Sequence, residues 1–566
     1  MKILSVYPFT HISSSALLIN GEIVSASAEE RFNREKMSIK FPIKSANWCL
    51  KKNNLTWSDL DAIVVPWNPQ INISNSSSRW TSNISWRGEL LSVVPAVLMR
   101  EMQLPCNEFM KVQWGENNLY FINHHLAHAA TGYYQSNFNS SDILTIDGHG
   151  EKESCFLGYG VKNKITQIAS INYPHSLGLF YGTITNFLGF KPDSDEWKVM
   201  AMASYVKGNR FDKKIKKLYK LTRDGFELDL SYFNYYKFDR EKYFFSEKFI
   251  SEFGKPRNKN DECCKFYFEI AASLQRNFEI ITTHLIKILK LKSPLNSKNI
   301  VLSGGAAMNS VFNGKLDKNK TYKNNYIGHA PDDSGVSIGS TLYLYHHIFN
   351  KKRIDKKEIQ TNYLGPKYSN ENILKILINN KLNYKKISNV EKIIAKEIKH
   401  GKIIGHFYGA MEFGHRALGN RSILADPRLK QNKEKVNNLI KFRENFRPFA
   451  PATLSNFVND IFEIPKNRRV NFMERVYPIK KKWKSIIPAV THVDGSGRIQ
   501  TVFRENNLRF YKIIREFYDL TGVPVLLNTS FNLNGEPVVM TPEDAIRTFY
   551  TCGLDILVLN DYIIYK

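Results

Sequence analysis

The chain of 566 residues, 43% of them hydrophobic, is too long for one hydrophobic core and predicts roughly two to four domains. Its formal net charge of +27 raises the question of a nucleic-acid partner, because clustered Lys and Arg attract phosphate. The excess cations, however, lie in Lys- and Asn-rich runs such as 207–223 and 318–325 that contain no RNA-binding motif. We interpret these runs as solvated surface and expect no nucleic-acid partner.

The sequence also argues against a membrane protein and a disulfide scaffold. No apolar run approaches the roughly 18 residues needed to cross a bilayer, and residues 1–15 lack the long apolar core of a signal peptide. We therefore expect a cytoplasmic protein with no membrane contact. The cysteines are scattered without a Cys-x-x-Cys pair, which indicates neither a disulfide framework nor a thiolate zinc site. They are Cys49, Cys106, Cys155, Cys263, Cys264 and Cys552.

Two stretches of the chain repeat the same order of strand, polar turn, strand, turn and strand. In the first, Asn20-Gly21 separates two apolar runs and predicts a hairpin, because both turn positions need positive φ. Helical sequence follows each stretch, which indicates two related α/β halves facing one cleft, the plan of actin-like nucleotide-binding folds. The predicted strands lie within 2–8, 16–19 and 22–30 and within 142–147, 154–160 and 165–171.

Helices are predicted around these strands. Residues 44–60 and 88–103 look helical, and 265–292 has apolar residues recurring at three and four, which predicts a long buried helix. The next segment, 299–310, reads as a strand, a double glycine and a helix start. Such a turn leaves backbone N–H groups free to approach a nucleotide, although a plain tight connection is an alternative.

A polar, charged stretch that ends in Gly-Pro predicts a linker at 351–366. It divides the chain into an N-terminal domain, 1–350, and a C-terminal domain, 367–566. In the C-terminal domain helical sequence alternates with short apolar strands. The predicted helical stretches are 369–400 and 428–443, and the predicted strands are 402–407, 523–528 and 554–559.

Three histidines lie within five residues in "NHHLAHAA". If a helix begins here, His124 and His128 lie one turn apart on one face, whereas His125 points about 100° away, toward substrate, neighbouring groups or solvent. Neutral imidazoles at this spacing suit iron or zinc, and Asp147 and Asp333, in turns after apolar segments, are the candidate carboxylate ligands. An exposed helix that merely carries histidines, and a catalytic histidine without metal, are the alternatives.

The C-terminal domain gathers cations in a pattern that favours anion binding. Residues 409–428 set Arg416, Arg421 and Arg428 in a glycine-rich frame that is poor material for a core helix. Arg recognises phosphate through two hydrogen bonds, Lys supplies a point charge, and Ser or Asn orients the anion. Scattered surface arginines are the alternative. The further candidates are Lys441, Arg443, Arg447, Arg498, Asn528, Thr529 and Ser530.

Eight motifs span nearly the whole chain: "HHLAHAA", "LTIDGHGE", "SLGLFYGTITNFLGF" with "DEWKVMAMA", "LSGGAAMNS", "DDSGVSIGS", "MEFGHRALGNRSILADPR", "FRPFAPA" and "LLNTSFNLNGEPVV". In this order they resemble the motifs of the O-carbamoyltransferases of the nodulation-protein and antibiotic-tailoring family. The chain departs from the family pattern at His415, where Pro is common, and in "MASYVKG", which replaces a more usual Ala-Pro-Tyr-Gly sequence.

The resemblance implies an α/β protein with a duplicated actin-like (Kae1-like) N-terminal domain and a C-terminal YrdC-like domain. The C-terminal domain would form carbamoyladenylate from carbamoyl phosphate and ATP, used with Mg²⁺. The N-terminal domain would then pass the carbamoyl group to a hydroxyl of a small-molecule acceptor. Fe²⁺, or another divalent ion such as Zn²⁺, would be held by His124, His128, Asp147 and Asp333.

The resemblance also implies roles for further residues. His11 would accept the proton of the acceptor hydroxyl, although Ile12 follows it where the family usually has Asp. Arg416 and Lys441 would act in catalysis and, with Arg447, Arg498 and Ser530, would bind carbamoyl phosphate. The residues implied to bind nucleotide are Ser303, Gly304, Gly305, Asn309, Asn528 and Ser530.

Two other functions stay open at the level of sequence. One is a tRNA threonylcarbamoyl-transfer enzyme, favoured by the similar fold and the net charge; the other is a non-catalytic nucleotide-binding protein. The acceptor is not identified by any motif, and the resemblance is compatible with a homodimer.

Overall fold

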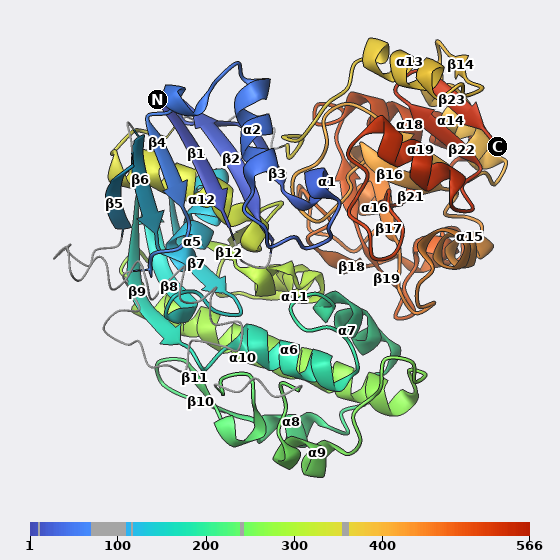
Figure 1. The fold of residues 1–566 in the computed structure, drawn as a ribbon. Coiled ribbons are helices and arrows are strands. Elements are labelled where there is room, and N and C mark those ends of the chain that lie inside the picture. Colours follow the sequence, from blue (N-terminus) through green and yellow to red (C-terminus); the bar gives the residue numbers. More distant parts are fainter. Residues whose placement is uncertain (9–11, 70–108, 115–116, 238–242, 354–360) are drawn as a thin grey trace. The chain divides into compact units, whose positions relative to one another are not determined.

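The computed structural model describes residues 1–8, 12–69, 109–114, 117–237, 243–353 and 361–566, and it has a mixed α/β architecture with several sheets (Figure 1). The chain divides into two compact units, and two segments from within residues 1–350 belong to the second unit, which contiguous domain boundaries do not predict. The first unit comprises Met1–Val24, Ile39–Asn309 and Leu316–Asp355, and the second comprises Ser25–Ser38, Ser310–Lys315 and Lys356–Lys566. Part of the predicted linker, 351–366, lies outside the described residues.

The N-terminal sheet of the first unit has six strands in the order β3-β2-β1-β4-β6-β5. Their bounds are β1 Lys2–Tyr7, β2 Ser14–Ile19, β3 Glu22–Ala28, β4 Ala62–Val65, β5 Phe109–Trp114 and β6 Asn117–Ile122. β1 pairs antiparallel with β2 and parallel with β4, and β4 pairs parallel with β6. Asn20 and Gly21 have φ of 51° and 91°, which confirms the predicted hairpin. The predicted helix at 88–103 lies outside the described residues.

The second sheet of this unit has five strands in the order β13-β12-β7-β8-β9. Their bounds are β7 Ser140–Ile146, β8 Glu153–Val161, β9 Lys164–Asn172, β12 Asn299–Ser303 and β13 Asn324–Ile327. β7 pairs antiparallel with β8 and parallel with β12, and β12 pairs parallel with β13. In both sheets, therefore, the first of three consecutive strands pairs in parallel with a strand that comes later in the chain.

Two helices connect these sheets. α12 (Val336–Tyr343) contacts β1 and β2, whereas α5 (His124–Gln135) contacts β7, β8 and β12, and the two helices pack against each other. Their approach requires glycine, because a Cβ at Gly339 would lie 1.9 Å from the carbonyl oxygen of Ala127. Thr131 Oγ1 donates to the carbonyl oxygen of Gly335 at 2.8 Å. The start of α12 is thereby fixed against α5.

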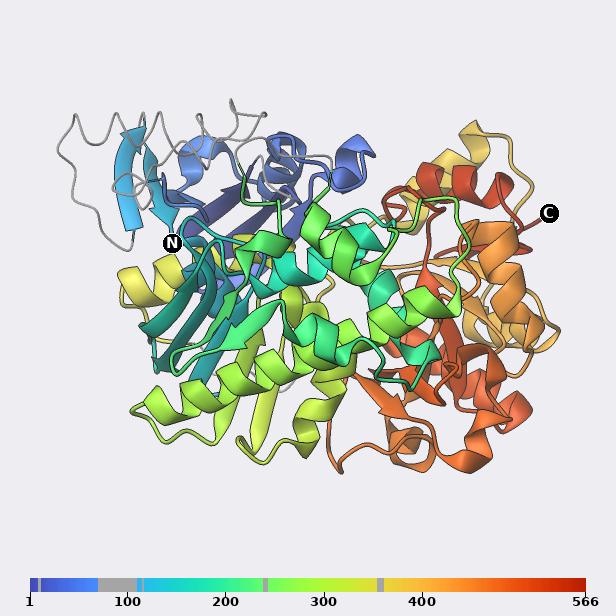
Figure 2. The ribbon, with the colours of Figure 1, turned by 90° about the horizontal axis from the view of Figure 1, so that it is seen from below.

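The predicted helix at 265–292 is confirmed as α10 (Lys265–Lys292), which Figure 2 shows as one long continuous helix. Its buried side chains recur at helical spacing, and it packs against α6 (Leu177–Phe187), α7 (Glu196–Met202) and α8 (Asp212–Lys216). Over the described part of the chain, no helix combines the length and apolarity that a membrane span requires.

The second unit is built on an eight-stranded sheet in the order β14-β23-β22-β15-β16-β21-β17-β20. The strands predicted at 402–407, 523–528 and 554–559 correspond to β15, β21 and β22. A separate pair is formed by β18 (Val476–Pro478) and β19 (Ser496–Arg498). The bounds in the large sheet are β14 Lys385–Lys386, β15 Ile404–Phe407, β16 Arg421–Ala425, β17 Ala450–Leu454, β20 Gln500–Val502, β21 Val525–Ser530, β22 Ile556–Leu559 and β23 Tyr562–Tyr565.

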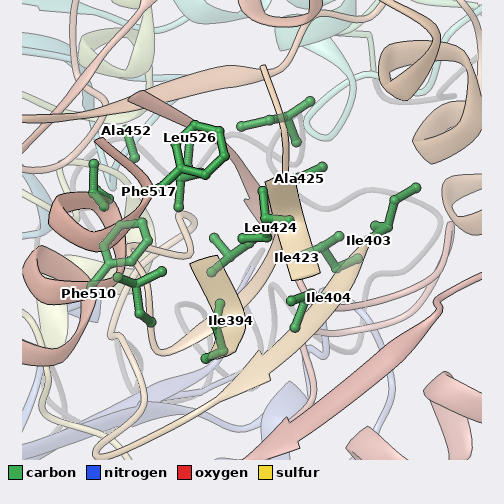
Figure 3. Packing of buried hydrophobic residues seen from close by; sticks show 14 of the residues in the cluster. Ile394, Ile403, Ile404, Ile423, Leu424, Ala425, Ala452, Phe510, Phe517 and Leu526 are labelled. Atoms are coloured by element: carbon green, nitrogen blue, oxygen red, sulfur yellow. The ribbon is translucent and has the colours of Figure 1, made fainter. Parts of the chain in front are cut away.

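Helices cover this sheet and close its core. The predicted helical stretch 369–400 forms two helices, α13 (Asn370–Asn379) and α14 (Val390–Lys399), with β14 between them. α14 packs against α18 (Leu508–Thr521), whose Phe510 and Phe517 belong to the same buried cluster as Leu526 of the sheet (Figure 3). Each such buried side chain contributes about 1.5–3 kcal/mol. The stretch 428–443 forms α15 (Gln431–Lys435), followed by a π-helical turn, η11 (Val436–Lys441).

Candidate functional site

The histidine motif lies at the start of α5, directly after β6. The Asn123 side chain caps the helix by accepting the N–H of Leu126 at 2.9 Å. His124 and His128 then lie one turn apart, fully buried, with their Nε2 atoms 3.1 Å apart. The alternative of an exposed helix is therefore wrong, and the predicted convergence of the outer two histidines is confirmed.

The two predicted carboxylates meet these imidazoles. Asp147 follows β7, and its Oδ2 lies 3.2 Å from Nε2 of His124 and 3.3 Å from Nε2 of His128. Asp333 begins the short helix η9 (Asp333–Gly335), and its Oδ1 lies 3.6 and 3.4 Å from the same two nitrogens. Four ligand atoms from three parts of the first unit thus lie within 4.8 Å of one another. We call these four residues the metal cluster.

The geometry of the metal cluster fits a divalent ion. Ligands about 2.1 Å from one ion are about 3.0–3.4 Å apart in octahedral or tetrahedral arrangement, close to the 3.1–3.6 Å observed here. Two imidazole nitrogens and two carboxylate oxygens are donors that iron and zinc accept. The donor set alone does not discriminate between these metals.

The carboxylate oxygens that face away from the imidazoles are held by donors. The backbone N–H of Gly305 donates to Asp147 Oδ1 at 2.8 Å, and the Tyr7 hydroxyl donates to Asp333 Oδ2 at 3.0 Å. Gly304, at φ 87°, allows this approach, because a Cβ there would lie 2.2 Å from the carbonyl oxygen of Ile146. Such outer contacts fix the orientation of ligating carboxylates.

The electrostatics of the metal cluster favour a cation. Burial opposes protonation of His124 and His128, yet hydrogen bonds and charges of Asp147 and Asp333 outweigh it and raise the pKa of both imidazoles. Burial also opposes ionisation of the two carboxyls, but the same histidines lower the pKa of both. Two ionised carboxylates in a buried site attract positive charge, whether protons or a metal ion.

Sequence reasoning missed Glu151, whose carboxylate holds the start of α5. It is fully buried and accepts the backbone N–H of His124 at 3.0 and 3.1 Å and that of Asn68 at 2.5 Å. Burial raises the pKa of Glu151 to about 7. The acid lies in the motif "LTIDGHGE", but its role at a helix N-terminus depends on a contact across 27 residues.

The central histidine of the motif is a buried residue. His125 Nδ1 lies 2.5 Å from Oγ1 of Thr145, and burial followed by the charges of His124 and His128 lowers the pKa of His125 to about 3. Of the three positions predicted for it, the surface is wrong. His125 is a neutral neighbour of the metal cluster.

The predicted nucleotide-binding residues of this unit lie at and after the end of β12, where Gly305 contacts Asp147 of the metal cluster. Ser303 donates to the carbonyl oxygen of Pro331 at 3.2 Å, and Gly304 and Gly305 form the turn beside Asp147. The Asn309 amide exchanges two hydrogen bonds with Gln275, at 2.9 and 3.0 Å. His11 lies outside the described residues.

The second unit places Lys441 in a ring of oxygen atoms. Lys441 ends η11, is 3% exposed, and its Nζ donates to the carbonyl and hydroxyl oxygens of Ser530, the latter at 3.3 Å. It also donates to the carbonyl oxygen and Oδ1 of Asn532 at 2.9 and 2.8 Å. Ser530 Oγ donates to the same Oδ1 at 2.7 Å. Asn532 is a second residue that sequence reasoning missed.

Further cations act on Lys441 electrostatically. Burial, then the charges of Arg443 and Arg447, lower the pKa of Lys441, and burial lowers that of Arg443. Burial and the charges of Arg416 and Arg443 lower the pKa of Arg498. Because a bound polyanion would relieve this repulsion, the arrangement suits phosphate groups. We call the set the cation cluster: Arg416, Lys441, Arg443, Arg447 and Arg498.

An open surface hollow of about 450 Å³ adjoins Arg443 of the cation cluster and is lined by Asn438, Phe442, Arg443, Glu444 and Asn534. Phe442 is 55% exposed and adopts a left-handed conformation at φ 44°. Asn534 Nδ2 donates to the Phe442 carbonyl at 3.2 Å. An exposed aromatic ring beside side-chain amides and cations can accommodate a nucleotide.

Three residues predicted to bind anions or nucleotide make contacts within the second unit. Arg421 is fully buried in β16, lies 3.6 Å over the Phe407 ring and donates to backbone carbonyls. Arg428 forms a bidentate pair with the buried Asp426, at 3.0 and 2.7 Å. Asn528 Nδ2 donates to Gln500 Oε1 at 2.8 Å. The anion role of Arg421 stays a prediction, with its two Nη atoms held by the carbonyl oxygens of Tyr408 and Pro366.

Comparison with known proteins covers both units. The family described as "Carbamoyltransferase N-terminus" matches residues 2–342, and "Carbamoyltransferase C-terminus" matches residues 395–566. An uncharacterized protein of Synechocystis is 34% identical over 100% of this chain and 96% of its own length. Nodulation protein NolNO of Sinorhizobium fredii is 32% identical over 99% of this chain and 79% of its own. Nodulation protein NolO of Bradyrhizobium diazoefficiens is 33% identical over 79% of both chains. This chain therefore belongs to the carbamoyltransferase family.

Proposed function

We propose that this carbamoyltransferase is an ATP-dependent O-carbamoyltransferase that forms carbamoyladenylate and then carbamoylates a hydroxyl of a small-molecule acceptor. The observation that carries this proposal is the cation cluster around Lys441, because a buried ammonium among arginines suits a polyphosphate. The open hollow beside Phe442 supports it, since it offers room next to Arg443 for the rest of the nucleotide.

We propose that carbamoyladenylate forms in two stages. Water cleaves carbamoyl phosphate to carbamate and inorganic phosphate, and a carbamate oxygen then attacks the α-phosphorus of ATP. The bond to the β-phosphate breaks, and pyrophosphate leaves, its Mg²⁺ and the cation cluster stabilising the charge that develops. Adenylation replaces a poor leaving group by a better one for the later attack of a neutral alcohol. We assign this step to the second unit, as a YrdC-like domain.

We assign transfer to the first unit, as a duplicated actin-like domain, which its two sheets of similar strand order support. The acceptor hydroxyl oxygen would attack the carbamoyl carbon, AMP would leave, and His11 would take the hydroxyl proton. Ser303, Gly304 and Gly305 would approach the nucleotide through their backbone. His124, His128, Asp147 and Asp333 would hold Fe²⁺ or another divalent ion, which when bound supplies Lewis-acid polarisation of the carbamoyl oxygen.

The proposal is tested by exchange of labelled pyrophosphate into ATP. Exchange is expected only when carbamoyl phosphate is present, since carbamate is needed to form the adenylate. Exchange that proceeds equally without carbamoyl phosphate overturns the proposed adenylation step. Incubation with ATP, carbamoyl phosphate and a panel of alcohols, followed by mass spectrometry for the gain of one carbamoyl group, then identifies the acceptor class.

The net charge of +27 is the observation that favours the second candidate, a tRNA threonylcarbamoyl-transfer enzyme. A gel shift with total tRNA at graded salt separates the two functions. Retention of tRNA at physiological salt would support the second candidate. Loss of binding as salt rises to that level would support the small-molecule acceptor. We further propose that the chain acts without a membrane partner and can form a homodimer.

A further inference from the structure

Residues Ser25–Ser38, which we call the strap, belong to the second compact unit although they lie near the N-terminus. The strap contains the end of β3 and the short helix α1 (Glu30–Asn33), drawn in blue in Figure 1. Phe32 packs against an apolar cluster in the C-terminal part of the chain, formed by Met411, Val538 and Met540. The second unit is thus completed by a segment that precedes it by more than 300 residues.

Arg34 is the polar anchor of the strap. Its Nη1 donates to the carbonyl oxygen of Val538 at 2.8 Å and its Nη2 to that of Pro537 at 2.9 Å. Its Nε lies 3.4 Å from Oδ1 of Asp544. Hydrogen bonds from a charged donor are about twice as strong as neutral ones, and a guanidinium can hold two carbonyls at once.

The backbone of the strap is held in a sparsely populated conformation at this point. Arg34 has φ of 61°, and its N–H donates to the carbonyl oxygen of Glu30 at 3.0 Å, closing α1. Met37 also has positive φ, and its N–H donates to Glu30 Oε2 at 2.6 Å. Such conformations are costly for residues other than glycine and persist where the surroundings fix them, often at functional sites.

The carbonyls that Arg34 holds follow, a few residues later in the chain, the two residues that contact Lys441. Residues 530–540 begin with Ser530 and Asn532, whose oxygens accept from the Lys441 ammonium. Asn532 Nδ2 donates to the carbonyl oxygen of Glu536 at 2.7 Å, one residue before the Arg34 contacts. A short path of hydrogen bonds therefore joins Arg34 to Lys441 through one loop.

The strap also carries a cation toward the same site. Lys36 is one of the charges that lower the pKa of Lys441, after burial, Arg443 and Arg447. Lys36 itself is exposed. The strap thus acts on the cation cluster in two ways: Arg34 holds the carbonyls of residues 537 and 538, and Lys36 adds a positive charge.

We propose that Arg34 is a positioning residue for the cation cluster: it holds residues 530–540 so that Ser530 and Asn532 fix the Lys441 ammonium where a pyrophosphate group binds. The proposal rests on the proposed adenylation function for its role in catalysis. It implies that the adenylation site depends on the N-terminal half of the chain, and that a fragment beginning at residue 356 lacks one of its supports.

The test uses the full-length chain and three variants, Arg34→Ala, Arg34→Lys and the matched control Arg547→Ala. Arg547 is the control because its guanidinium pairs with the same carboxylate, Asp544, at 2.9 Å. We expect the Kd for pyrophosphate with Mg²⁺, measured by calorimetry, to rise about 10-fold in Arg34→Ala, since misplacement of a binding group by 1 Å is costly. Arg34→Lys keeps the positive charge but loses the two parallel N–H donors of the guanidinium. Its Kd is expected to lie between those of the wild type and Arg34→Ala.

A merely structural role is distinguished by two further readouts. Deuterium uptake in residues 531–540 should rise in Arg34→Ala and stay at the wild-type level in Arg547→Ala. An unchanged Kd, or a lower Tm with normal affinity in the folded fraction, overturns the proposal. Pyrophosphate binding does not need carbamoyl phosphate. If the wild-type protein binds pyrophosphate but shows no carbamoyl-phosphate-dependent exchange, the proposed adenylation function is contradicted. The binding assay with the Arg34 variants still tests the positioning role of Arg34.

Discussion

The metal cluster of the first unit brings buried carboxylates together, whereas the cation cluster of the second unit brings buried ammonium and guanidinium groups together. In the first, Asp147 and Asp333 share a buried space with two imidazoles, and in the second Lys441 shares one with arginines. Neither arrangement stabilises the fold as well as apolar residues of similar size would. The difference supports the proposed division of labour, in which the first unit would hold a divalent cation and the second a polyphosphate, one for each step of the proposed reaction.

The largest expected effect on the difference between the two clusters comes from removing Lys441, the centre of the cation cluster. Lys441→Ala is expected to lower carbamoyl-phosphate-dependent pyrophosphate exchange at least about 100-fold, because the developing charge loses its buried ammonium. Lys512→Ala, an exposed lysine of α18, is the matched control and should exchange at the wild-type rate. Exchange that survives in Lys441→Ala would move the adenylation step away from the cation cluster.

Removing a ligand of the metal cluster should have the complementary effect. His128→Ala is expected to reduce the bound metal, measured by elemental analysis, from about one ion per chain to a small fraction, because the remaining ligands no longer surround the ion. Transfer to the acceptor should be lost while pyrophosphate exchange continues. His284→Ala, on α10 of the same unit, is the control. Equal loss of exchange and transfer would contradict the division of the two steps.

Acidification offers a smaller and reversible version of this experiment. The pKa values of His124 and His128 are raised, so protons occupy the imidazoles at a higher pH than in a free histidine, and a metal ion must displace them. Zn²⁺ affinity should therefore fall as pH decreases below the raised pKa values and level off above them. The expected slope is about 10-fold per pH unit for one displaced proton and about 100-fold for two. Affinity that is flat between pH 6 and 8, measured against a competing chelator, would exclude the imidazoles as ligands.

The two clusters also differ in how far sequence could predict them. The placement of His124 and His128 on one face follows from the 3.6-residue period of a single helix and from its Asn cap. A local sequence pattern was therefore enough to predict it. Asp147 and Asp333 follow from turns at the ends of buried segments. Arg416 and Arg421 stand in the same glycine-rich frame, but strand register buries Arg421.

Long-range contacts of the second unit are not encoded in any local pattern. Lys441 reaches Asn532 across 91 residues, and Arg34 reaches Pro537 across 503. The π-helical turn that carries Lys441 replaces an expected α-helix. Period and turn chemistry report on neighbours along the chain, whereas these contacts depend on which strands pair in the eight-stranded sheet.

The smallest expected effect concerns Asn309, which resemblance assigns to nucleotide binding and which the structure pairs with Gln275. Replacing either side chain by Ala leaves a buried amide without its partner, which costs about 1–3 kcal/mol. Gln275→Ala should cost more, because Gln275 also contacts Tyr181 and Glu279, at 3.2 and 3.0 Å.

If Asn309 acts only through this pair, the double variant destabilises the protein by less than the sum of the single variants, and neither changes the Kd for ATP analogues. If Asn309 also contacts the nucleotide, Asn309→Ala alone weakens that binding while the stability effects stay the same. Denaturant unfolding and nucleotide binding, measured on the same three variants, therefore separate packing from recognition at one residue of the transfer site.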